Sequence, residues 1–177
     1  KKMILRNNAK LNDDIYVTGN LGDSFMGLKI LKKNIYTTKN LKKYFINKYY
    51  SPDIHPRLTN KLFSFANTSI DISDGLIADL EKLINNQKLS YKLYLEKIPI
   101  SENLKKLIKL RKLNKNNFLS KGDDYQILFT ANTFNSRIIS KISKSLNIKI
   151  SKIGKICSIS QKNQIIDQKG EKIALKD

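Results

Sequence analysis

Short β-forming segments alternate with segments of helical periodicity along almost the whole of this 177-residue chain. The β-forming segments are rich in branched and aromatic residues, whereas the others place apolar residues three and four positions apart. The expected strands cover residues 15–18, 68–72, 91–98, 125–130, 148–159 and 164–167. The expected helices cover residues 24–33, 38–48, 57–66, 75–85, 101–113 and 135–146. This continuous alternation, without a repeat or a low-complexity linker, predicts one α/β (α+β) domain with helices layered on a mixed β-sheet.

The composition supports a folded domain and excludes several classes of protein. A hydrophobic content of 40% suits a chain that buries about 70% of its unfolded surface on folding. No apolar run approaches the roughly 18–20 residues that a membrane-spanning helix requires, and residues 1–6 do not resemble a signal peptide. The single cysteine, Cys157, excludes an internal disulfide and fits a reducing compartment. We therefore expect a cytoplasmic protein with no membrane contact.

The formal charge of +19 raises the question of nucleic-acid binding. Only four of the 34 basic residues are arginine, and the lysines are spread through almost every segment. The densest basic stretch, residues 105–112, has its leucines at helical spacing and predicts an ordinary amphipathic helix. Because nucleic-acid surfaces are typically built from clustered arginine and aromatic residues, we expect no specific nucleic-acid partner, only weak attraction to polyanions at low salt.

Three short turns combine glycine with carboxylates at the ends of expected strands: residues 19–24, 71–75 and 122–124. Asp71, Ser73 and Asp74 lie in the second turn, immediately before a helix. Carboxylates bind Mg²⁺, and a hydroxyl with the free N–H groups of a helix start binds phosphate oxygens. The turn therefore predicts a site for Mg²⁺ and a nucleotide. The alternative is that Ser73 or Asp74 only caps the helix.

Five motifs occur in a fixed order along the chain. They are RNNAK at 6–10, DIYVTGNLGDS at 14–24, PR at 56–57, DISDGL at 71–76 and GDDYQILFT at 122–130. In order and spacing these motifs resemble the C-terminal half of the thiamine-monophosphate kinase family. That family is part of the aminoimidazole ribonucleotide synthetase-like superfamily, and the resemblance extends over nearly the whole chain.

The resemblance implies the fold of the aminoimidazole ribonucleotide synthetase C-terminal domain and a Mg²⁺-dependent transfer of the ATP γ-phosphate to thiamine phosphate, which gives thiamine diphosphate. It implies that Arg6 and Ser73 contact ATP and that Asp71 and Asp74 bind Mg²⁺. Asp123 stands where the family has a substrate-contacting glutamate, and its side chain is shorter by one methylene. No residue is expected to act as a nucleophile or base, because the acceptor phosphate is already an anion.

Other residues in the motifs have simpler interpretations. Asp124 is expected to orient its loop or to form a turn or helix cap, and Asp23 and Ser24 to stabilise a helix start. His55 precedes a proline and is expected to be a turn residue. Cys157 is expected to be a small core residue.

The chain departs from the family at both ends. The resemblance implies that residues 1–177 do not include the N-terminal domain that in the family supplies most of the metal carboxylates and the dimer interface. It implies the same for the final segment, whose aromatic residue helps to hold thiamine. We therefore expect residues 1–177 to be the single C-terminal domain of a two-domain, homodimeric kinase, and to be inactive alone. Two alternatives remain: another superfamily member, such as aminoimidazole ribonucleotide synthetase, selenophosphate synthetase or a hydrogenase-maturation protein, and a basic nucleic-acid-binding module.

Overall fold

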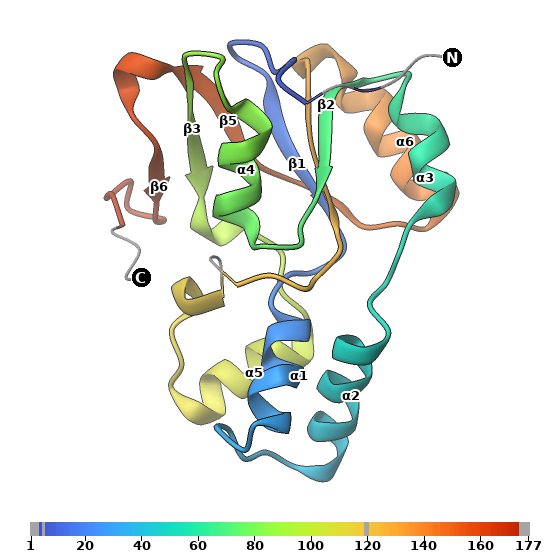
Figure 1. Ribbon diagram of the computed structural model, residues 1–177, viewed down its shortest axis with the longest axis vertical. Helices are drawn as coiled ribbons and strands as arrows, with labels where there is room; N and C mark the ends of the chain where they lie inside the picture. Colours follow the sequence, from blue (N-terminus) through green and yellow to red (C-terminus); the bar gives the residue numbers. More distant parts are fainter. Residues whose placement is uncertain (1–3, 5, 119–120, 174–177) are drawn as a thin grey trace.

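The alternating segments form a layered structure in the computed structural model, which describes residues 4, 6–118 and 121–173 (Figure 1). The strands of the described residues are β1 (Asp14–Thr18), β2 (Ala66–Asp71), β3 (Leu89–Tyr94), β4 (Ile127–Ala131), β5 (Ile150–Ser158) and β6 (Gln164–Ile166). The α-helices are α1 (Asp23–Leu31), α2 (Lys39–Tyr50), α3 (Pro56–Leu62), α4 (Leu76–Ile84), α5 (Glu102–Arg111) and α6 (Ser136–Leu146). Short 3-10 turns are η1 (Leu95–Lys97), η2 (Lys115–Phe118), η3 (Thr133–Asn135) and η4 (Ile159–Gln161).

The strands form one mixed sheet in the order β2-β4-β1-β5-β3-β6. All neighbouring pairs are antiparallel except β3 and β6, which run parallel. Strand β1 lies in the middle of the sheet, and all five of its residues are buried. This arrangement confirms the predicted α+β class with a mixed sheet.

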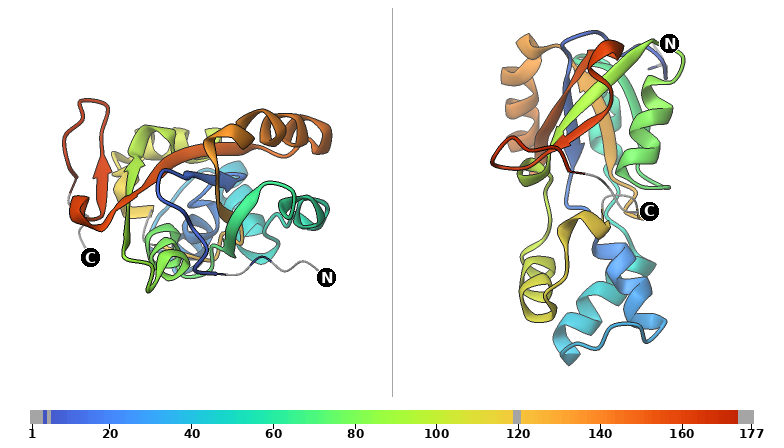
Figure 2. Two further views of the ribbon diagram at one scale, coloured as in Figure 1. Left: turned by 90° about the horizontal axis from the view of Figure 1, so that it is seen from above. Right: turned by 90° about the vertical axis from the view of Figure 1, so that its left-hand side faces the viewer.

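Alternation along β1 and β4 divides the apolar residues between the two faces of the sheet. Ile15, Val17 and Leu128 share one core with α4. Tyr16 and Phe129 point to the other face, where their rings stack at 5.2 Å and pack with residues of α3 and α6. Figure 2 shows α4 and α6 on opposite sides of the sheet.

Helices α1, α2 and α5 form a separate layer beyond one end of the sheet (Figure 1). Its core contains Met26, Phe45 and Leu104. Gly27 allows α1 to approach α2, because a Cβ at that position would lie 2.3 Å from the carbonyl oxygen of Phe45. Two of the three turns, at residues 19–24 and 122–124, lie in connections between this layer and the sheet, whereas the turn at residues 71–75 joins β2 to α4.

The structure corrects several of the predicted boundaries. The helix expected over residues 57–66 ends at Leu62, and Ala66 already belongs to β2. The strand expected from residue 125 begins at Ile127, because Tyr125 has a φ of 52°, which is incompatible with an extended strand. The strand expected to reach residue 98 ends at Tyr94 and continues as η1, and the polar segment after α5 contains η2. In the described part of the chain, none of the helices is long and apolar enough to span a bilayer.

Candidate functional site

Two of the three predicted turns lie directly against each other. The backbone N–H of Asp123 donates to the carbonyl oxygen of Ser73 at 3.0 Å, and that of Tyr125 donates to Ile72 at 2.9 Å. Gly122, which precedes Asp123, lies so close to Ser73 that a Cβ on Gly122 would be 1.9 Å from the Ser73 carbonyl oxygen. The loop of residues 122–125 therefore continues the pairing of β2 and β4 beyond the ends of these two strands and places Asp123 beside the turn at residues 71–75.

The third turn joins this arrangement through Asp124. Its Oδ2 accepts a hydrogen bond from the N–H of Gly22 at 2.7 Å, and its Oδ1 accepts one from Ser24 at 3.4 Å. Gly22 is the N-cap of α1 and has a φ of 88°, a conformation that favours glycine. Asp124 thus supplies the side-chain cap for a helix that begins about a hundred residues earlier, because no residue of α1 itself provides one.

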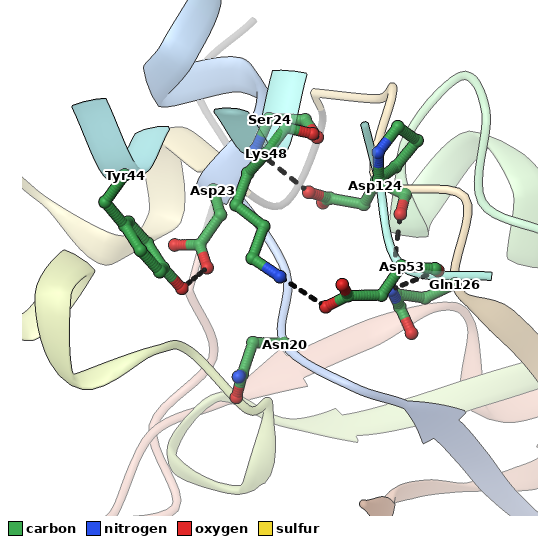
Figure 3. Close-up of a pocket in the computed structure, with 9 residues that line it drawn as sticks. Asn20, Asp23, Ser24, Tyr44, Lys48, Asp53, Asp124 and Gln126 are labelled. Atoms are coloured by element: carbon green, nitrogen blue, oxygen red, sulfur yellow. Dashed lines mark hydrogen bonds and ion pairs between the residues drawn. The ribbon is translucent and has the colours of Figure 1, made fainter. Parts of the chain in front are cut away.

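Asp124 and Asp23 are both buried beside a small polar cavity at this junction (Figure 3). Burial raises the pKa of Asp124 to about 7, although its hydrogen bonds from Gly22 and Ser24 act in the opposite direction. Burial also raises the pKa of Asp23, which accepts hydrogen bonds from Tyr44 at 2.8 Å and Ser101 at 2.7 Å. The cavity volume of about 30 Å³ suits one or two water molecules rather than a substrate.

Gln126 connects the same loop to two other segments. Its Oε1 accepts a hydrogen bond from the Thr18 hydroxyl at 2.8 Å and lies 2.9 Å from Nε2 of His55. Its side chain also lies over Gly19, where a Cβ would approach Gln126 Oε1 to 2.3 Å. His55 is therefore more than the turn residue predicted from sequence, because it helps to fix the Gln126 side chain.

The turn at residues 71–75 is held from inside by Asp79, a residue that sequence reasoning missed. Oδ2 of Asp79 accepts hydrogen bonds from the backbone N–H groups of Ser73, Asp74 and Gly75 at 2.9, 2.9 and 3.1 Å. The residue is fully buried, with an exposed fraction of 0%. The N–H groups that the sequence predicted to be free for phosphate are therefore occupied by this carboxylate.

The hydrogen bonds of Asp79 also bear on the alternative that Ser73 or Asp74 only caps the helix α4. Gly75 is the N-cap of α4, and neither Ser73 nor Asp74 makes the expected side-chain cap. Asp79 lies in the first turn of the helix and satisfies the N-terminal donors in their place. This leaves the Ser73 hydroxyl and the Asp71 and Asp74 carboxylates without a structural task in the helix start.

Lys82 partly neutralises this turn. Its ammonium donates to Oδ1 of Asp79 at 2.9 Å and also pairs with Asp74. The hydrogen bond to Asp74, followed by that to Asp79, raises the pKa of Lys82. Asp74 is exposed, so this ion pair is open to solvent and replaceable.

Four of the five predicted site residues lie at this end of the sheet. Asp71 is the exposed last residue of β2, Asp74 is exposed, and Ser73 and Asp123 are half-buried neighbours. Arg6 lies elsewhere. The next residue, Asn7, bonds to the carbonyl of Leu83 at 3.3 Å, at the opposite end of α4, and a nine-residue helix is about 13 Å long. The structure therefore does not bring Arg6 to the turn.

Asp71 and Asp74 are exposed carboxylates of one turn, and carboxylates are the side chains that Mg²⁺ prefers. Mg²⁺ usually binds one or two protein carboxylates and completes its shell with water and phosphate oxygens. Within residues 4, 6–118 and 121–173, no three His, Cys, Asp or Glu side chains gather as a ready metal cage. The two exposed carboxylates are thus suited to a metal that a phosphate ligand shares.

Comparison with known proteins shows which proteins this chain resembles. No protein-family model matches the chain. A thiamine-monophosphate kinase of Buchnera aphidicola subsp. Acyrthosiphon pisum is 39% identical over 168 residues, which cover 93% of this chain and 51% of the relative. A second, from Buchnera aphidicola subsp. Schizaphis graminum, is 39% identical over 180 residues and is covered to 54%. The chain therefore spans about half the length of these curated relatives.

Solved structures show the same similarity. The crystal structure of thiamine-monophosphate kinase from Stenotrophomonas maltophilia superposes with a TM-score of 0.81 at 27% identity, over 95% of this chain and 53% of that one. A structure described as AaThiL complexed with AMPPCP and TMP gives 0.77 at 27% identity, over 97% and 52%. The HypE–HypF complex, at 18% identity and a TM-score of 0.70, over 97% of this chain and 54% of that one, shares the fold. Over the half that it covers, the chain is therefore similar in sequence and fold to the thiamine-monophosphate kinases, as its motifs predicted.

Proposed function

We propose that this chain is the ATP- and substrate-binding C-terminal domain of a two-domain thiamine-monophosphate kinase. In this proposal the whole protein acts in the cytoplasm as a homodimer formed through its N-terminal domain. It transfers the γ-phosphate of ATP to thiamine phosphate and requires Mg²⁺. The proposal draws on the similarity to relatives with that name and on a solved relative described with AMPPCP and TMP.

The observation that carries the proposal is the backbone pairing of two loops. Asp123 and Ser73 are joined by a hydrogen bond of 3.0 Å, so a residue expected to contact substrate lies beside one expected to contact ATP. Bringing donor and acceptor phosphates together is the main requirement of a reaction in which the acceptor is already an anion.

Each residue has a distinct role in the proposed reaction. Asp71 and Asp74 would bind Mg²⁺, which neutralises charge on the phosphates when it is bound. The Ser73 hydroxyl would donate to a phosphate oxygen of ATP, and Asp123 would contact thiamine phosphate. Arg6 would contact the ATP phosphates, which requires Arg6 to lie differently in the nucleotide complex. Asp79 and Asp124 would hold the two loops in place.

The direct test is a kinase assay on the chain alone and on a full-length form. In the full-length form, the chain is fused after the N-terminal half of the relative from Buchnera aphidicola subsp. Acyrthosiphon pisum. We expect thiamine diphosphate from the full-length form with ATP, Mg²⁺ and thiamine phosphate, and none from the chain alone. Product from the chain alone would contradict the proposed two-domain requirement. A folded full-length form that binds ATP and Mg²⁺ but phosphorylates another acceptor would assign the chain to a different superfamily member.

A further inference from the structure

A second cavity, of about 480 Å³, lies where the sheet meets the helical layer. It is lined by residues of η1, of the connection from η1 to α5, of α5, of η2 and of the start of β5. Its lining residues are Glu96, Lys97, Ile98, Pro99, Ile100, Lys105, Lys115, Lys149 and Ser151. None of them belongs to the proposed ATP and substrate site.

Four lysines from different segments line this cavity, and within the described residues only Lys105 has a carboxylate partner. The ammonium of Lys115 donates to the carbonyl oxygen of Leu95 at 2.6 Å. That of Lys149 donates to Oδ1 of Asn20 at 2.8 Å. These acceptors are neutral, so they orient the two ammonium groups and leave the positive charges in place. Among the ion pairs of the described residues, neither Lys115 nor Lys149 takes part.

The remaining charges do not neutralise the cavity. Lys105 pairs with Glu102 at 2.7 Å, an exposed pair that solvent weakens. Lys97 lies 4.6 Å from the centre of the Tyr94 ring and keeps its charge. Glu96 is the one acid in the lining. The cavity therefore has an excess of positive charge in a concave surface, which concentrates the field.

Burial makes this excess unfavourable in the absence of a ligand. It lowers the pKa of Lys115 and of Lys149. The charge of Lys105 lowers both further, whereas Glu96 acts against the shift of Lys115, and Glu102 and Asp23 act against that of Lys149. An anion between these ammonium groups would replace lost water and relieve the repulsion, because charge-assisted hydrogen bonds are the strongest that such groups form.

The size and lining indicate the class of ligand. The volume falls within the range of roughly 300–1,000 Å³ that is typical of small-molecule sites. Ile98, Pro99 and Ile100 give the cavity an apolar wall, and its lining contains neither the arginine nor the aromatic side chains on which nucleic-acid bases stack. We propose that this cavity, here called the lysine cavity, binds a small anion that carries a phosphate or diphosphate group.

Calorimetric titration with inorganic pyrophosphate tests the proposal. The chain is titrated at physiological salt in the presence of a chelator, which removes divalent cations and so keeps pyrophosphate from the acidic turn at residues 71–75. The variant Lys115→Met/Lys149→Met is expected to bind at least about tenfold more weakly, since two charge-assisted hydrogen bonds are lost. If that pair does not fold, Lys97→Met/Lys105→Met serves the same purpose.

The matched control is Lys141→Met/Lys144→Met. These lysines lie on the exposed side of α6 and their removal lowers the net charge by the same amount. Retained affinity in this control, with loss in the cavity variant, supports the proposal. Equal weakening in both variants, or no binding by the original chain, overturns it. Binding of a single-stranded RNA that pyrophosphate does not displace, together with no cavity effect, would assign the basic surface to nucleic acid instead.

Discussion

Oδ2 of Asp124 lies 2.7 Å from the backbone nitrogen of Gly22, although the two residues are 102 positions apart. This hydrogen bond ties the loop that carries Asp123 to the first turn of α1. The Asp124 carboxylate is buried, so the protein keeps an ionisable group where its charge is costly. The Asp124 side chain therefore helps to position the loop, together with the backbone hydrogen bonds of Asp123 and Tyr125.

Asp124 should make stability depend on pH. Its pKa is about 7 in the folded chain and about 3.9 in an unfolded one, so folding favours the protonated form. The resulting stabilisation is complete below about pH 4 and is lost as pH rises through about 7. Between about pH 4 and pH 7, the unfolding free energy should decrease less in the Asp124→Asn variant than in the original chain. The difference between the two decreases should be up to a few kcal/mol. Urea unfolding at several pH values measures this difference.

The control for this prediction is Glu171→Gln, which removes an exposed carboxylate outside the cavity beside Asp124. It leaves Asp124 and its neighbours in place, so this variant should retain the pH dependence that Asp124 causes. The same slope in Asp124→Asn and in the original chain would contradict the role assigned to burial.

Asp79→Asn should destabilise the chain by about 1–3 kcal/mol, because an amide is a weaker acceptor for three N–H groups and no longer attracts Lys82. Urea unfolding at neutral pH measures the loss. Glu171→Gln removes an exposed carboxylate and should change the unfolding free energy little. If both variants unfold alike, the turn does not depend on Asp79.

Gly122→Ala should separate the two paired loops, because its Cβ cannot occupy a point 1.9 Å from the Ser73 carbonyl oxygen. We expect faster hydrogen exchange at the N–H groups of Asp123 and Tyr125, which donate to Ser73 and Ile72. Gly170→Ala is the control, since a Cβ there meets nothing within 4 Å even though its φ is +83°. Unchanged exchange at Asp123 and Tyr125 in Gly122→Ala would show that the loops are not locked together.

Local patterns predicted most of the fold, because helices and strands are set largely by the spacing of apolar residues. They placed β1 and α4 within one or two residues and identified the three turns. They failed at Tyr125, whose positive φ has no signature in an apolar segment. They could also not show that β4 lies between β2 and β1, since pairing between distant strands is not encoded in periodicity.

The site was predicted less completely than the fold. The types and spacing of Asp71, Ser73 and Asp74 indicated their turn. The carboxylate that accepts hydrogen bonds from the N–H groups of this turn belongs to Asp79, five residues after Asp74 in the amphipathic helix α4. The sequence signal for this role was the position of Asp79, a carboxylate four residues after Gly75 and so within the first turn of the helix. Gln126 could not have been found, because its partners Thr18 and His55 are distant in sequence.

In the proposed function, the turn at residues 71–75 binds the Mg²⁺ of a nucleotide. The most direct measurement is the Mg²⁺ dependence of thiamine diphosphate formation by the full-length form, compared between the original sequence and Asp71→Asn, with Glu171→Gln as an exposed control. We predict that Asp71→Asn lowers kcat at least about a hundredfold, or shifts the required Mg²⁺ concentration upward by a similar factor, since a charged ligand is lost. An Asp71→Asn enzyme with unchanged kcat and unchanged Mg²⁺ requirement would contradict the account.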